Sequence, residues 1–353
     1  MKKLLVFLIV LLLCSGQAAA AELPEELVDS LPDSAADIGA EEGWSAGISN
    51  LLSLVQERFF SLLREGVGGI VQLLLVLFLC GIAETLFFSA KGKHTFNYVA
   101  LTATAAVVLV SAGDLSHLMG LGRETIGELE AFSKVLLPTM AAATASMGMA
   151  GAASVRQVTT VFFCDLLISL INRLILPLIY LYIGALAAGS MLGDSRLDGI
   201  ARGIKKAVVW VLSGLLTIFT LYLSVAGAVW GTVDGAAVKV TKKAIAGVVP
   251  VVGNIISGAA ETVLAGAGVL KNSIGVFGVL AVLSICVLPF LKLGVQYLLY
   301  KAAAFAASTV SSPSLVKLID GLGGAFGLLL GTVASCALLL LVSLISSLMV
   351  VAV

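Results

Sequence analysis

Long apolar runs dominate this chain. A helix needs about 20 predominantly apolar residues to cross the hydrocarbon core of a bilayer. Six runs reach that length, and no stretch shows the period-two alternation of a half-buried strand. They cover residues 67–89, 98–117, 158–189, 207–231, 275–299 and 326–351. We therefore predict an all-α, polytopic membrane protein with about six transmembrane helices, whose membrane domain comprises residues 67–353.

The N-terminal residues 1–21 have the layout of a secretory signal peptide. Two lysines precede the apolar stretch 4–13, and a run of alanines supplies the small residues of a cleavage site. We place the cleavage after Ala20 or Ala21. The mature chain would then begin outside the cytoplasm.

Residues 22–66 form an acidic segment that we expect outside the cytoplasm. Residues 22–65 hold ten of the 21 acidic residues of the chain. From Gly47 to Gly66, apolar residues recur with helical spacing, which predicts an amphipathic helix that ends near Gly66. Such a helix either lies on the membrane surface or packs on the membrane domain.

Lysine and arginine placement mostly supports an external N-terminus. With six spans, three connections then lie inside, and each carries a net positive charge, as cytoplasmic loops usually do. Of the two outer connections, residues 118–157 are neutral, whereas residues 232–274 carry four lysines against two acidic residues. The second outer connection fits the opposite orientation better, but we give the signal peptide more weight.

Residues 236–271 are too apolar for a surface loop and too interrupted for an ordinary transmembrane helix. Pro250, Gly253 and Gly258 interrupt the segment, and Glu261 adds a charge. Residues that break a helix are tolerated at membrane depth only where protein or water satisfies the freed backbone groups. We predict two short helices with a turn near Pro250, which either lie in the interface or enter the bilayer as a re-entrant hairpin.

Four ionisable residues inside the apolar runs are candidates for a polar pathway. They are Glu84, Asp114, Asp165 and Arg173. A charge at the bilayer centre costs at least about 2.5–3.5 kcal/mol, so it usually faces protein, water or a partner. Asp165 and Arg173 lie two helical turns apart, too far to bond each other, and Arg173 has Glu84 as one candidate partner. Buried structural pairs, or residues that reach the interface, are the alternative, which we favour. The same run contains Pro177, where we expect a tilt or a break.

Glycines at intervals of four residues predict close helix packing. They occur in two sets, Gly227, Gly231 and Gly235, and Gly323, Gly327 and Gly331. A helix face without side chains lets two backbones approach closely in lipid. The spacing does not say whether this packing occurs within one chain or between chains.

The composition agrees with a membrane protein and offers no catalytic centre. The chain is 59% apolar and 12% charged, against about 45–50% and about 25% in soluble domains. A net charge of zero gives no basic field for nucleic acid. Five cysteines and two histidines show no disulfide or metal-binding spacing, and no catalytic or nucleotide-binding motif appears. We expect no enzyme activity, no cofactor and no metal.

Four stretches of the chain carry a family resemblance. They read FSKVLLPTMAAATASMG, TVDGAAVKVTKKAIAGVVPVVGNIISGAAETV, VLKNSIGVFGVLAVLSICVLPFLKL and SSPSLVKLIDGLGG. The chain resembles the stage III sporulation protein AE family of endospore-forming bacteria. The resemblance covers nearly the whole chain, is strongest from about residue 130 onward, and leaves residues 22–65 poorly matched.

The resemblance implies a subunit of a multiprotein channel, or feeding tube, between mother cell and forespore. The implied partners are a secretion-type ATPase, small membrane proteins and ring-forming intermembrane proteins, and the implied location is the mother-cell-derived membrane around the forespore. The family brings no catalytic residues to carry over. Two other functions stay open, a stand-alone permease that uses Glu84, Asp165 and Arg173, and an intramembrane enzyme.

Overall fold

The chain folds into long helices, as the apolar runs predict. The computed structural model describes residues 44–90, 98–146, 152–192, 195–225, 273–309 and 311–351. Its elements are α4 (Trp44–Ala90), α5 (Tyr98–Ser146), α6 (Ala152–Leu170), the π-helix η1 (Ile171–Ile175), α7 (Leu176–Leu192), α8 (Ser195–Val225), α11 (Ser273–Ala307) and α12 (Pro313–Val351). Six helical stretches are long and apolar enough to cross a membrane. The all-α fold class with about six spans is confirmed.

Several sequence predictions fall outside the described residues. These are the signal peptide 1–21, most of the acidic segment 22–66, and the broken segment 236–271 with Pro250, Gly253, Gly258 and Glu261. The glycine set Gly227, Gly231 and Gly235 falls there as well. All of them stay predictions.

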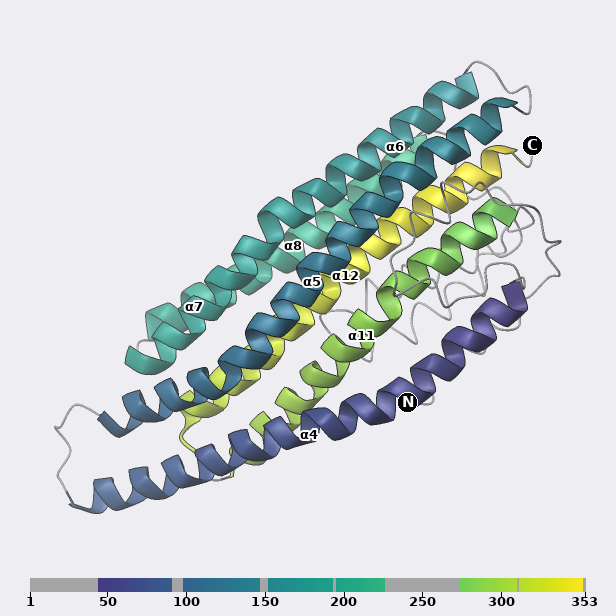
Figure 1. Cartoon of the computed structure of the whole chain (residues 1–353). Coiled ribbons are helices and arrows are strands. Elements are labelled where there is room, and N and C mark those ends of the chain that lie inside the picture. The colour runs from purple at the N-terminus through teal and green to yellow at the C-terminus, as the bar shows by residue number, and fades with distance from the viewer. Residues whose placement is uncertain are drawn as a thin grey trace, which may run out of the picture.

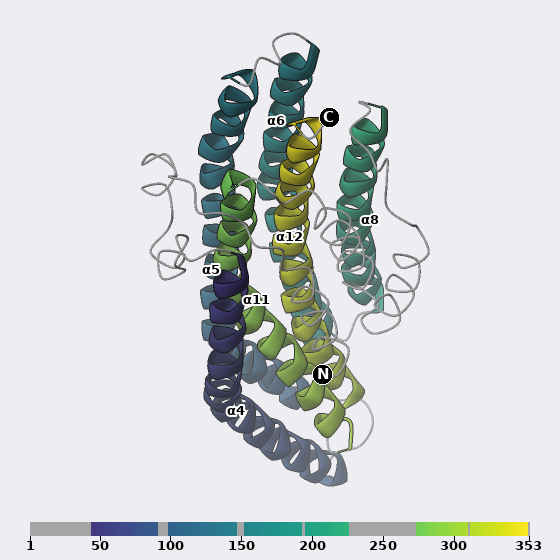
Figure 2. The same cartoon turned by 90° about the vertical axis from the view of Figure 1, so that its right-hand side faces the viewer.

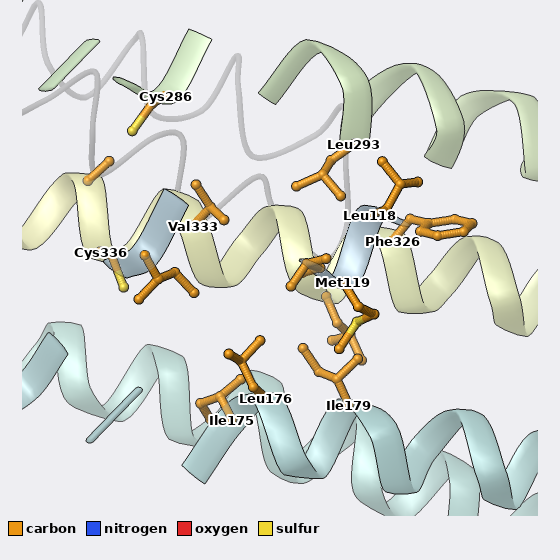
Figure 3. Packing of buried hydrophobic residues seen from close by; sticks show 14 of the residues in the cluster. Leu118, Met119, Ile175, Leu176, Ile179, Cys286, Leu293, Phe326, Val333 and Cys336 are labelled. Atoms are coloured by element: carbon orange, nitrogen blue, oxygen red, sulfur yellow. The ribbon is translucent and has the colours of Figure 1, made fainter. Parts of the chain in front are cut away.

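Helix α12 forms the centre of the bundle. In its most apolar stretch 89% of the residues are buried, against 22% in α4. It packs against α5, α6, α7, α8 and α11, which surround it in Figures 1 and 2. Figure 3 shows Met119 of α5, Ile179 of α7 and Leu293 of α11 directed toward Phe326 and Val333 of α12. Because α12 carries no charged residue after Asp320, it is suited to this buried position.

Helix α4 does not end near Gly66, and the predicted boundary there is wrong. The helix continues from Trp44 to Ala90 without a break. Gly66 lies directly against the Leu299 side chain of α11, so this glycine provides close helix contact where the sequence suggested a stop. The N-terminal half of α4 therefore packs on the membrane domain, which was one of its two expected positions.

Helix α5 also runs further than predicted. The expected outer connection 118–157 is helical as far as Ser146. Its apolar residues continue at intervals of three or four and are buried, namely Leu118, Met119, Gly122, Ile126, Leu129, Phe132 and Leu136. Of the charged residues of this stretch, Arg123, Glu124 and Lys134 are exposed, whereas Glu128 and Glu130 are half-buried beside the buried stripe. Charge content alone was therefore a misleading guide to the end of this span.

The expected interruption near Pro177 takes the form of a π-helical turn. Ile171–Ile175 separates α6 from α7 directly before this proline. Proline has no N–H to bond the carbonyl four residues earlier, which here belongs to Arg173. The wider π turn accommodates the missing bond and allows the helix to continue, as such turns often do within α-helices.

Contacts between helices fix their relative heights. Gly122 of α5 lies against Leu329 of α12. Fourteen residues further along α5 and fifteen further along α12, Leu136 and Leu344 meet at Gly278 of α11. Since α5 and α12 advance in step between these contacts, residue 130 of α5 is level with about residue 337 of α12. That height is near the middle of the uncharged stretch 321–353.

The hairpin of α4 and α5 projects past the other helices. Gly69 of α4 is level with Asp114 of α5, whose carboxylate lies 3.9 Å from the position of an added Cβ at this glycine. Asp114 in turn contacts Tyr300 of α11. From this height α4 continues to Ala90, whereas α11 ends at Ala307. Figure 1 shows the end of the hairpin beyond the ends of α7, α11 and α12.

Candidate functional site

A charged cluster joins α5 and α6 at the height of the uncharged stretch of α12. The Glu130 carboxylate accepts hydrogen bonds from Lys134 Nζ at 2.9 Å and from Ser169 Oγ at 3.1 Å. Lys134 Nζ also lies 4.0 Å from Asp165 Oδ1. One ammonium group therefore lies between two carboxylates that come from different helices. Glu130 and Lys134 meet because residues four apart share a helix face.

The members of this cluster differ in exposure. The Lys134 side chain is 55% exposed, the Asp165 side chain 36% and the Glu130 side chain 19%. The Asp165 Oδ1 atom itself is buried and has no hydrogen-bond partner among the described residues. A surface ion pair contributes little in water, but charges at lipid depth need a protein or water environment. At this height we expect such a cluster to face protein or water and not lipid.

Arg173 and Glu84, two of the four predicted ionisable residues, are not brought into this cluster by the described contacts. Arg173 lies on η1, is exposed, and forms no ion pair with any described residue. The side chain of Glu84 lies outside the description, although its backbone belongs to α4. The suggested pairing of these two residues therefore stays a prediction.

Asp114 lies in a separate polar contact between α5 and α11. It is half-buried, and its Oδ2 accepts hydrogen bonds from Gln296 Nε2 at 2.7 Å and from the Tyr300 hydroxyl at 3.3 Å. A half-buried carboxylate with two donors is a satisfied structural group. This arrangement matches the structural alternative for Asp114 better than a pathway.

The glycines of the second predicted set are buried in α12, and two of them face α11. An added Cβ at Gly323 would lie 3.1 Å from Tyr300 Cβ, and one at Gly327 would lie 3.1 Å from the ring of Tyr297. The carbonyl of Gly331 accepts a hydrogen bond from Ser335 Oγ at 2.8 Å. At the first two positions the close packing therefore occurs within one chain.

A second glycine face of α12 was not foreseen. An added Cβ at Gly321 would lie 2.6 Å from Leu186 of α7, and one at Gly324 would lie 3.0 Å from the Tyr182 hydroxyl. That hydroxyl donates a hydrogen bond to the Gly321 carbonyl at 3.0 Å. The signal was present in the sequence, since Gly321 and Gly324 are three residues apart and share a helix face.

One end of the bundle carries a band of basic residues. Lys301 of α11 pairs with Asp320 of α12, and Lys317 Nζ lies 3.5 Å from Asp198 Oδ2 of α8. Lys205 of α8 lies beside Gly324. An excess of lysine and arginine is typical of the cytoplasmic side of a membrane protein, so this end fits the predicted inner side.

Comparison with known proteins identifies the family. The family model described as stage III sporulation protein AE matches residues 37–352. This chain belongs to that family. It is also 26% identical over 249 residues to the stage III sporulation protein AE of Bacillus subtilis (strain 168), and the match covers 70% of this chain and 62% of that relative. The matched region thus spans less than two thirds of the relative's length. No solved structure matches.

Membership of the stage III sporulation protein AE family implies a role in sporulation. Together with the six candidate spans, it makes this chain a sporulation-related membrane protein. Among the described residues, no group of three or more His, Cys, Asp or Glu could hold a metal ion. Of the described cysteines, Cys164, Cys286 and Cys336 are buried and form no disulfide.

Sequence reasoning missed Glu130, Lys134 and Ser169 as members of the charged cluster. The first two lie in the stretch that was assigned to an outer connection, so they were not considered as residues at membrane depth. The helical spacing of buried residues from Leu118 to Leu136 was the signal that could have placed them. Their contact with α6 depends on how the helices pack, and one sequence does not contain that information.

Proposed function

We propose that this protein is a membrane-embedded, non-enzymatic subunit of a multiprotein, secretion-like sporulation complex. The complex would form a channel that links mother cell and forespore and is needed for spore development. The proposed partners are a secretion-type ATPase, small membrane proteins and ring-forming intermembrane proteins. The proposed location is the mother-cell-derived membrane around the forespore. Family membership supports this proposal, since the family is named for the third stage of sporulation.

The extent of exposed apolar surface is the structural observation that carries the proposal. On α6, Phe162 and Leu166 are exposed near the height of the charged cluster. On the projecting part of α4, Leu75, Phe78 and Ile82 are exposed. From Phe162 to Ile82 the helices extend roughly 50 Å at 1.5 Å per residue, whereas the hydrocarbon core of a bilayer is about 30 Å thick.

One bilayer therefore does not cover both apolar surfaces at once. An exposed apolar patch that lipid does not cover usually marks contact with another protein. The basic band lies between the two surfaces, at the height where α11 and α12 meet through Lys301 and Asp320. This favours the bilayer around α6, α8, α11 and α12, with the hairpin of α4 and α5 covered by other subunits.

A stand-alone permease is less well supported. Asp165 and Arg173 would have to face a common path inside the chain. Instead the Asp165 side chain is partly exposed and contacts Lys134, and Arg173 is exposed at the outer side of η1.

Spore counts in the native host test the proposed function. We expect deletion of the gene to abolish heat-resistant spores at the third stage, and the wild-type gene to restore them. Restoration should fail in strains that lack the proposed ATPase or ring-forming partners. Normal spore counts after deletion would contradict a required role, and restoration without partners would favour a protein that acts alone.

A further inference from the structure

From Ala112 to Pro138, the outer face of α5 lacks the large apolar side chains that cover the other outer helices, whereas one turn earlier Leu109 is exposed by 77%. The face is defined by Gly113, His117, Gly120, Glu124, Ala131 and Lys134, which are all exposed and recur at helical intervals. Arg123 is exposed beside it. Between Ala112 and Pro138, no exposed residue is large and apolar. Leu137 is left out of this statement, because the structure does not describe its side chain. We call this surface the α5 polar face.

The neighbouring helix α6 has the opposite character at the same height. Glu130 and Ser169 bond across the two helices, which places the Ala131 and Lys134 end of the polar face beside the C-terminal end of α6. There α6 exposes Phe162, Leu166 and Leu170, with exposed fractions of 67%, 50% and 42%. Position along the bundle therefore does not explain why this surface of α5 is polar. The polar character belongs to the α5 face itself.

Small residues on a membrane helix are also typical of tight packing against another helix. Two observations argue against that interpretation for α5. An added Cβ at Gly113 or Gly120 meets no atom of the described residues within 4 Å, so the described part of the chain does not fill this surface. Long charged side chains stand between the glycines, at Arg123 and Glu124. A helix packed closely onto the face would bury these charges, and partner groups would have to replace their hydration.

We propose that the α5 polar face lines a water-filled path through the membrane region of the assembly. The face carries acidic and basic groups together, so the path would suit small hydrophilic solutes without a strong preference for the sign of their charge. Lys134, held between Glu130 and Asp165, would stand at the water boundary of this wall. Other subunits must close the path, so this inference rests on the proposed function.

Thiol labelling in membrane vesicles from sporulating cells tests the proposed path. The parent variant needs only Cys14→Ser and Cys80→Ser, because Cys164, Cys286 and Cys336 are buried and shielded from a charged reagent. Single substitutions Gly113→Cys, Gly120→Cys and Ala131→Cys probe the face. Leu166→Cys on α6 is the control, since it is exposed near the height of Ala131. The probe is a cationic, membrane-impermeant methanethiosulfonate.

We expect the three α5 positions to react at least about tenfold faster than Leu166→Cys, because the reactive thiolate forms in water and is disfavoured in lipid. Rates as slow as the control would show that lipid covers the face and would overturn the inference. Slow labelling with disulfide formation to a second copy or another subunit would also overturn it, by showing a packed helix. Labelling is independent of spore counts, so failure of the path and failure of the proposed function are distinguishable.

Discussion

At the scale of single residues, glycines on α12 decide how closely its neighbours approach. Gly323 and Gly327 leave space for Tyr300 and Tyr297 of α11, and Gly324 leaves space for Tyr182 of α7. Each tyrosine buries a large apolar area in its contact. This close contact is possible because the opposite glycine has no side chain. Loss of one glycine should therefore separate two helices over more than one contact.

Gly327→Leu should destabilise the protein by about 1–3 kcal/mol, because the new side chain would overlap the ring of Tyr297. Gly184→Leu on α7 is the matched control, since an added Cβ there meets nothing within 4 Å. Replacing a mid-helix glycine without a clash should leave stability unchanged or raise it by about 0.5–1 kcal/mol. Unfolding by SDS in detergent micelles measures both effects. Equal midpoints for the two variants would show that Gly327 is not at a tight contact.

Spacing in the sequence predicted the packing role of Gly323 and Gly327, but not their partners. The tyrosines that fill these spaces come from α11, and no local pattern marks them. Asp114 is a similar case. The sequence placed it inside an apolar run, whereas its donors Gln296 and Tyr300 lie 182 and 186 residues away along the chain.

At the scale of helices, α4 and α5 differ most from the predicted boundaries. Both were divided where charge or glycine interrupted an apolar run. In both, the buried stripe continues through the interruption, with Leu51, Ile70, Leu73 and Leu77 in α4. A long amphipathic helix can carry charges on one face while the other stays buried. The number of spans was predictable from composition, but the ends of these two helices depend on what each face contacts.

Oxidation of paired cysteines tests the contact of α4 with α11. Gly66→Cys with Leu299→Cys should form a disulfide, because Gly66 lies against the Leu299 side chain. Gly68→Cys with Leu299→Cys is the control, since Gly68 points to open space on another face of α4. Mass spectrometry of the linked peptides after oxidation reports both pairs. Equal disulfide yields for the two pairs, or no disulfide in either, would show that this part of α4 does not pack on α11 and lies elsewhere, for example on the membrane surface.

At the scale of the whole molecule, the apolar surface is offset along the bundle. The uncharged stretches of α8, α11 and α12 share one height, and part of the exposed apolar surface of α4, from Leu75 to Ile82, lies beyond the basic band. Sequence alone placed all six spans side by side, since hydropathy carries no information on relative height. The offset arises from pairwise contacts such as Gly69 with Asp114 and Gly66 with Leu299. A single bilayer leaves part of such a molecule uncovered, which is expected of a subunit and not of an isolated monomer.

Site-specific photo-crosslinking in sporulating cells tests this account most directly. A benzophenone amino acid at Phe78 would report what covers the projecting part of α4, and the same group at Phe162 of α6 is the control. Both side chains are exposed, by 53% and 67%. We predict that Phe78 gives adducts well above the 36.2 kDa of the chain, whereas Phe162 gives lipid adducts alone. Absence of protein adducts at Phe78, with behaviour like that of Phe162, would contradict the proposal that this chain is a subunit of an assembly.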